Sequence, residues 1–172
     1  MLSSEAPAPE PEALSVRLAA LLVPDGVIVW DEPVARDEAV RLLVDRVAPT
    51  VPDLTASAAL ERLAERDALG PTHIGEGVDL PHARLDEVRR PAFAIGLTRG
   101  GVEGEPAPTE VVWLLLLPPG GGGLETTAQV ARACRDERFR AALRDARDAP
   151  SVRTALGAWE RAHDLPSGSW SR

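Results

Sequence analysis

The uninterrupted apolar run VVWLLLL at residues 111–117 is the sequence feature that most constrains the fold of this chain. The run is far shorter than the roughly 20 residues that a membrane helix needs, and Pro118 and Pro119 end it. A strand without polar alternation is typically buried on both faces. We therefore expect residues 110–117 to form a central strand of a sheet that is covered on both sides.

Helical and extended patterns alternate along the rest of the chain. Apolar residues recur with helical spacing in residues 14–22, 40–47, 55–69, 124–134, 136–143 and 151–159. Strand patterns occupy residues 27–30 and 92–97, and the glycine-rich residues 72–84 indicate short strands joined by a tight turn. This alternation predicts the α/β class, as a single-domain sandwich with a mixed central β-sheet flanked by helices.

The two ends of the chain differ from the domain between them. Residues 1–13 carry alternating prolines without apolar periodicity, so we expect a disordered N-terminal tail. We assign residues 14–164 to the folded domain and expect residues 165–172 to be a frayed C-terminus. The chain has no signal-peptide pattern and no stretch long enough to span a membrane. We therefore expect a soluble, cytoplasmic protein without membrane insertion.

Charge and cysteine content restrict the partners of the chain. The formal net charge of -8 repels polyanions and argues against nucleic acid as a partner. All 19 basic residues are arginine, so a local cationic site remains open. The single cysteine, Cys134, forms no internal disulfide and fits a reducing cytosol. We interpret Cys134 as a small buried hydrophobic residue of an amphipathic helix.

Three histidines, His73, His82 and His163, are the candidate chemical groups. His163 lies near the end of the last expected helix, where an imidazolium interacts favourably with the helix dipole. We expect a structural role for it. His73 and His82 lie nine residues apart in the glycine-rich segment, and a neutral imidazole is a competent nucleophile near pH 7.

The stretch around these two histidines, residues 65–85, reads ERDALGPTHIGEGVDLPHARL. It resembles the active-site signature of type-2 enzyme IIA domains of the phosphotransferase system, the mannitol/fructose type. That signature contains Glu-Arg-Glu, then Leu-Gly-Ser-Thr-Gly-Ile-Gly, then Gly-Ile-Ala-Ile-Pro-His. The flanking elements fall in family order over residues 14–162, and the stand-alone nitrogen-regulatory branch is the nearest comparison in length.

The resemblance implies that the protein is a phosphocarrier with a role in sugar transport or regulation. His82 would accept a phosphoryl group from the phosphohistidine of an HPr-type carrier protein. It would then pass the group to an enzyme IIB partner or hold it as a regulatory mark, with a regulated kinase or transporter as a possible partner. Arg66 matches the family arginine beside the histidine, and Arg84 is a second candidate. No cofactor and no metal are implied.

Elementary chemistry supports these roles. Phosphoryl transfer passes through a loose in-line transition state, so positioning and cationic stabilisation supply most of the catalysis. A guanidinium such as that of Arg66 binds phosphate through paired hydrogen bonds. Pro81 restricts the residue before it to extended geometry and so helps to fix His82. Gly75 and Gly77 leave room for a partner to approach.

Two positions depart from the family signature. The second family histidine falls on Gly123 here, so only backbone at the start of a helix would be available, and His73 is a candidate replacement. Asp79 places a carboxylate three residues before His82, and we expect it to face away. A Gly123→His substitution is expected to speed or prolong phosphorylation.

Less specific interpretations stay open beside this one. His82 could be an ordinary solvated side chain, and Arg66 an ordinary arginine on a helix surface. The alternative function is an enzyme IIA-like module that docks to a partner without transferring phosphate. The residues His73, Asp79 and His82 form a conceivable zinc site, but no third histidine or thiolate lies nearby.

Overall fold

The computed structural model describes residues 17–105, 108–121 and 123–163. The strands are β1 (Leu22–Trp30), β2 (His73–Gly75), β3 (Val78–Asp79), β4 (His82–Arg84), β5 (Ala92–Thr98) and β6 (Val111–Leu117). The helices are α1 (Arg36–Val47), α2 (Ala56–Asp67), α3 (Gly123–Arg135), α4 (Glu137–Asp145) and α5 (Ala149–His163), with 3₁₀ turns at Leu18–Ala20 and Ala48–Thr50.

The sheet is mixed and has β6 in its interior. Its strand order is β1-β5-β6-β3-β2. β4 also pairs with β6, at residues 115–117, further along β6 than the residues that pair with β3. β6 runs antiparallel to β5 and parallel to β3 and β4, and β1 runs parallel to β5. Every residue of β6 is buried. The continuous apolar run therefore forms the expected central strand, and the predicted mixed α/β sandwich is confirmed.

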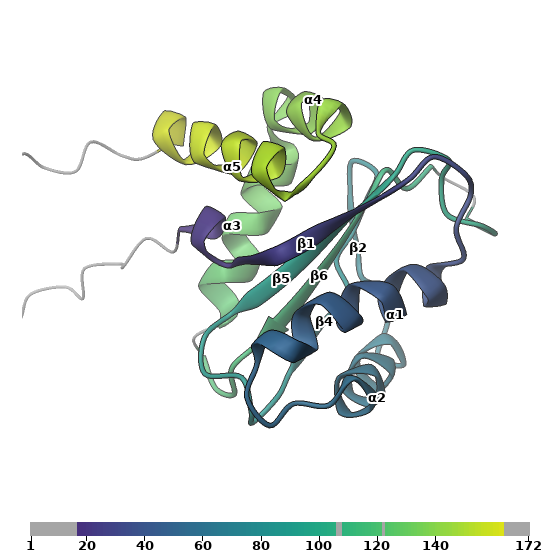
Figure 1. Ribbon diagram of the computed structural model, residues 1–172, viewed down its shortest axis with the longest axis vertical. Helices are drawn as coiled ribbons and strands as arrows, with labels where there is room; N and C mark the ends of the chain where they lie inside the picture. Colours follow the sequence, from purple (N-terminus) through teal and green to yellow (C-terminus); the bar gives the residue numbers. More distant parts are fainter. Residues whose placement is uncertain (1–16, 106–107, 122, 164–172) are drawn as a thin grey trace, which may run out of the picture.

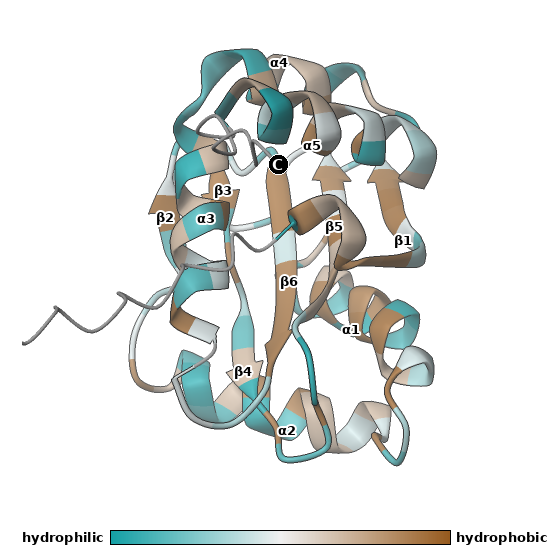
Figure 2. Ribbon diagram, turned by 90° about the vertical axis from the view of Figure 1, so that its left-hand side faces the viewer, coloured by the Kyte–Doolittle hydropathy of each residue, from teal (hydrophilic) through white to brown (hydrophobic). Residues whose placement is uncertain are grey.

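Helices cover both faces of the sheet (Figure 1). α1 and α2 cover one face and pack against a core that includes Val112 and Leu114. α3, α4 and α5 cover the other face, over a core that includes Trp113 and Leu115. Because side chains alternate along a strand, the single run in β6 supplies both cores. In Figure 2, β4 and α2 lie at one end of the sheet, and α4 lies at the other.

The start of the domain corrects the expected first helix. Within residues 17–22 the chain forms only a 3₁₀ turn at Leu18–Ala20, and β1 already begins at Leu22. Residues 23–26 form a bulge inside β1, where the register with β5 shifts and Asp25 takes a φ of 51°. Pairing with β5 overrides the helical spacing of the leucines. The expected tail at 1–13, the end at 165–172 and Leu14 lie outside the described residues.

Cys134 is expected to be chemically inert in the folded protein. It lies on the buried face of α3, in the core, and burial raises the pKa of its thiol to about 12, although Arg140 nearby acts in the opposite direction. At pH 8 its thiolate fraction should be lower than that of an ordinary cysteine by on the order of a thousand-fold. Iodoacetamide labelling followed by mass spectrometry should modify Cys134 only after unfolding. Rapid labelling of the native protein would contradict this burial.

Candidate active site

His82 is held in a defined ring orientation at the first position of β4. Its strand pairs in parallel with Leu115 of β6, and the Leu115 N–H donates to the Pro81 carbonyl at 2.9 Å. The ring is partly exposed, and its Nδ1 lies 2.8 Å from the Leu80 carbonyl oxygen. A carbonyl can only accept, so Nδ1 carries the hydrogen in the neutral ring. The lone pair is then on Nε2, the atom free to act as a nucleophile.

Arg66 lies in the last turn of α2 and faces this nitrogen. Thr55 caps the start of α2, where its hydroxyl accepts from the Ala58 N–H, and the helix packs against β4. The Arg66 Nε donates to His82 Nε2 at 3.3 Å, and its Nη1 donates to the Gly70 carbonyl at 3.2 Å. In the described part of the chain Arg66 forms no ion pair with a carboxylate. His82 is partly exposed, and the Arg66 guanidinium lies within hydrogen-bond distance of its ring.

The two side chains line an open, cationic cavity of about 410 Å³. Its polar lining is Arg62, Glu65, Arg66, His82, Arg84 and Thr127. Glu65 is paired with Arg62 at 2.7 Å, so the arginines leave a net positive charge around Nε2. Arg84 donates to the Gly120 carbonyl, which fixes its direction. Arg84 therefore lies where the sequence suggested, and Arg62 is a cavity residue that sequence reasoning missed, although its place one turn before Arg66 was a usable signal.

His73 and Gly123 do not complete the cavity as expected. His73 does not line it, because its Nε2 faces Glu105 Oε2 at 3.0 Å and Thr109 at 3.4 Å. A Cβ on Gly123 would lie 2.9 Å from Leu117 Cδ1, so a side chain there would press into the core. The α3 residues that line the cavity are Leu124 and Thr127. Gly123→His is therefore expected to strain the Leu117 packing rather than to restore a second imidazole.

Asp79 points away from the cavity, as strand alternation predicted. It is 1% exposed, and its carboxylate accepts from Arg36 Nε at 2.7 Å and from the Thr72 hydroxyl at 2.5 Å. Arg36 also donates to Asp67 at 2.8 Å. Burial alone would lower the pKa of Arg36, but its hydrogen bonds to the two aspartates and their charges raise it above its ordinary value.

The residues that could hold a metal ion differ from the group considered from the sequence. Ligand atoms of His73, Asp79 and Glu105 lie within 4.8 Å of one another, and His82 is not part of this group. The Asp79 carboxylate is already neutralised by the Arg36 guanidinium. A cation at this position would have to compete with that ion pair, so the group is better explained as a set of ion pairs.

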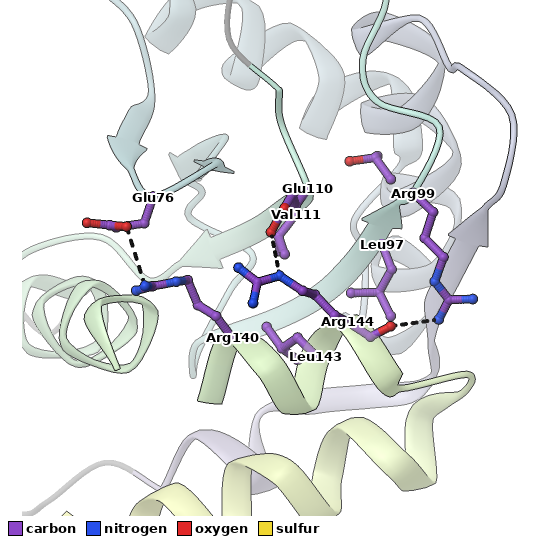
Figure 3. A pocket seen from close by; sticks show the side chains of 9 residues that line it. Glu76, Leu97, Arg99, Glu110, Val111, Arg140, Leu143 and Arg144 are labelled. Atoms are coloured by element: carbon purple, nitrogen blue, oxygen red, sulfur yellow. Dashed lines mark hydrogen bonds and ion pairs between the residues drawn. The ribbon is translucent and has the colours of Figure 1, made fainter. Parts of the chain in front are cut away.

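A second cavity lies at the opposite end of the sheet, beside α4, and it contrasts with the His82 cavity (Figure 3). Its two α4 arginines are engaged by carboxylates: Arg140 lies 3.4 Å from Glu76, and Arg144 lies 3.1 Å from Glu110. It contains no histidine among the described residues. At His82, Arg62 is paired with Glu65, but Arg66 and Arg84 form no ion pair with a carboxylate among the described residues, so the His82 cavity is the better site for an incoming anion.

An imidazole nitrogen beside guanidinium groups in an open cavity is the arrangement that a histidine phosphoryl carrier needs. The chain belongs to the family of the phosphoenolpyruvate-dependent sugar phosphotransferase system, EIIA 2, whose model matches residues 21–158. Members of this family are phosphocarrier domains.

Two curated relatives and a solved structure illustrate this membership. The chain is 30% identical over 145 residues to the 2-O-alpha-mannosyl-D-glycerate-specific EIIABC component of Escherichia coli, covering 80% of this chain but 22% of that protein. It is 28% identical to a nitrogen regulatory protein of Bradyrhizobium diazoefficiens, covering 79% of this chain and 92% of the relative. The structure of nitrogen regulatory protein IIA-Ntr from Neisseria meningitidis matches with a TM-score of 0.70 and 25% identity, covering 81% of this chain and 98% of that one.

The match confirms the resemblance seen in the sequence, including both the sugar-specific and the nitrogen-regulatory relatives. The chain spans only about a fifth of the length of the mannosylglycerate component, so the specificity named for that protein is not carried over here. Among the described residues, no helix is long and apolar enough to cross a membrane.

Proposed function

We propose that the protein is a phosphocarrier in which His82 Nε2 accepts a phosphoryl group from the phosphohistidine of an HPr-type protein. The observation that carries this proposal is the pair of contacts on one ring: Nδ1 donates to Leu80, and Nε2 faces Arg66. The group then passes to an enzyme IIB partner or stays as a regulatory mark. Nitrogen regulatory relatives support the second use.

The transfer needs little from the protein beyond this geometry. The donor's N–P bond breaks and its electron pair stays on the donor imidazole, while the Nε2 lone pair of His82 forms the new N–P bond. The Nδ1 hydrogen remains on the ring, and the Leu80 carbonyl stabilises the positive charge that the ring acquires. Arg66 exchanges its contact with Nε2 for the phosphoryl oxygens, where its charge-assisted hydrogen bonds are stronger.

An apolar rim around the cavity supports a protein as the phosphoryl donor. Leu69, just after α2, is 83% exposed, and Leu124, in the first turn of α3, is 72% exposed. Both line the His82 cavity. Exposed apolar side chains around a charged centre are typical of a protein-binding surface. A small-molecule donor would not need them.

Replacing Leu124 by alanine is therefore expected to weaken docking without affecting the chemistry. Losing one leucine contact at an interface corresponds to about a tenfold rise in the KM for the carrier protein, with kcat nearly unchanged. Ile74→Ala is the matched control, since Ile74 is also exposed, at 37%, but does not line the cavity. Equal effects of the two substitutions on KM would show that the rim does not bind the donor.

Incubation with phosphoenolpyruvate, enzyme I and the HPr-type carrier, followed by intact-mass measurement, tests the proposed function. We expect the mass to rise by one phosphoryl group. A mass that stays constant, with the carrier itself phosphorylated, would favour the non-transferring regulatory module. The observation that favours the non-transferring module is that His82 is the only histidine lining the cavity among the described residues.

A further inference from the structure

One guanidinium, that of Arg36 at the start of α1, joins two segments that lead to the candidate active site. Its Nε donates to Asp79 of β3 at 2.7 Å, and its Nη1 donates to Asp67, the last residue of α2, at 2.8 Å. Its Nη2 donates to the Thr72 hydroxyl at 3.0 Å. We call these four side chains, Arg36, Asp67, Thr72 and Asp79, the Arg36 clamp.

Each arm of the clamp ends next to a residue that sets the geometry of the site. Asp67 directly follows Arg66 in α2. Asp79 precedes Leu80, whose N–H donates to the Thr72 carbonyl at 3.0 Å and whose own carbonyl accepts the His82 Nδ1 hydrogen. The clamp therefore spans both the helix end that carries Arg66 and the peptide that orients the His82 ring.

We propose that Arg36 is a positioning residue for phosphoryl transfer. Through Asp67 and Asp79 it holds the Arg66 guanidinium and the His82 imidazole in a fixed position relative to each other. This proposal rests on the proposed function. It also gives a role to Asp79, the acidic departure from the family signature: its charge is used in the clamp and does not oppose the incoming phosphoryl group.

Neutralising the buried Asp79 would by itself account for one arm of the clamp, because a buried charge needs a partner. It does not account for the other arm. Asp67 is 33% exposed and would be solvated without Arg36, yet the guanidinium reaches it with two nitrogens, at 2.8 and 3.4 Å. The contact with Asp67 adds nothing to the neutralisation of the buried Asp79 carboxylate. Its structural consequence is to fix the end of α2 against β3, next to Arg66.

The Asp67 arm can be tested without leaving a charge buried and unpaired, as removal of Arg36 would. Asp67→Ala removes the arm and keeps the best helix-forming residue at the end of α2. Asp67→Glu is the rescue variant, because it restores the carboxylate. Asp45→Ala is the matched control, since Asp45 is also a helical aspartate paired with an arginine, Arg41, but is exposed and does not line the cavity.

The first measurement is NMR of the Arg66 Nε–H and the His82 ring nitrogens in the unphosphorylated protein. Asp67→Ala should shift both sets of signals and speed hydrogen exchange at Arg66 Nε at least several-fold, whereas Asp67→Glu and Asp45→Ala should leave them near wild type. Unchanged signals in a folded Asp67→Ala protein would overturn the proposal. This measurement needs no phosphoryl donor, so it decides the clamp even if the chain proves not to accept phosphate.

The second measurement is the phosphorylation rate of His82. We expect Asp67→Ala to slow it about tenfold, because misplaced groups lose much of the benefit of pre-organisation, and Asp67→Glu to recover most of the rate. In an Arg66→Ala background the same substitution should have little further effect, since Asp67 acts through Arg66. A full tenfold loss in that background, or no loss in the wild-type background, would contradict the positioning role.

Discussion

Replacement of His82 by glutamine is expected to abolish phosphorylation by phosphoenolpyruvate, enzyme I and the HPr-type carrier. Glutamine has a similar size and polarity, but it has no nitrogen lone pair that can form the N–P bond. Because His82 is only partly buried, the free energy of unfolding should change by no more than about 1 kcal/mol. Intact mass before and after incubation with the donor system measures the effect.

His73→Gln is the control for this prediction. His73 lies in the same glycine-rich segment, but it faces Glu105 and does not line the cavity. We expect the His73 variant to be phosphorylated at close to the wild-type rate. Phosphorylation of the His82→Gln protein, or its loss in the His73→Gln protein, would show that the phosphoryl group is carried by a different histidine.

Arg66→Ala is expected to slow phosphorylation of His82 by about 100- to 1,000-fold. Removing one pre-organised donor from the site of a developing charge typically costs that much in rate. Arg66→Lys should recover only part of the loss, because an ammonium is a point charge without the paired donors of a guanidinium. The rate of mass increase under limiting enzyme I and carrier, in a time course, gives both values.

Arg41→Ala provides the matched loss of an arginine outside the site, on the exposed surface of α1. It should leave the rate unchanged, which separates a local effect of Arg66 from the change in net charge. If Arg66→Ala and Arg41→Ala slowed the reaction equally, general electrostatics would explain the result and the contact between Arg66 and His82 would have no catalytic meaning.

The parts of the fold that depend on local pattern could be predicted from the sequence. The continuous run in β6 indicated a central strand because burial on both faces leaves no place for polar side chains, and all of it is buried. α2 could be placed because Thr55 caps its start and apolar residues follow at helical spacing. His82 and Arg66 could be paired because the segment that contains them resembles a family signature.

The parts that depend on distant contacts could not be predicted. Arg36 and Asp79 are 43 positions apart, and only the folded chain shows that the carboxylate is neutralised. The leucines at 18, 21 and 22 have helical spacing, but pairing with β5 makes Leu22 the first residue of a strand. Counting along the chain placed Gly123 at the site, whereas the packing against Leu117 turns that position toward the core. Sequence spacing does not report such orientations.

The most direct test of the account is to identify the phosphorylated atom. Protein labelled with ¹⁵N-histidine, phosphorylated by the carrier system and examined by ¹⁵N and ³¹P NMR, distinguishes the two nitrogens of each ring. The account predicts one phosphorylated ring, that of His82, with the phosphoryl group on Nε2 and the hydrogen on Nδ1, because the Leu80 carbonyl holds Nδ1–H at 2.8 Å. A phosphoryl group on Nδ1 of His82, or on His73 or His163, would contradict it.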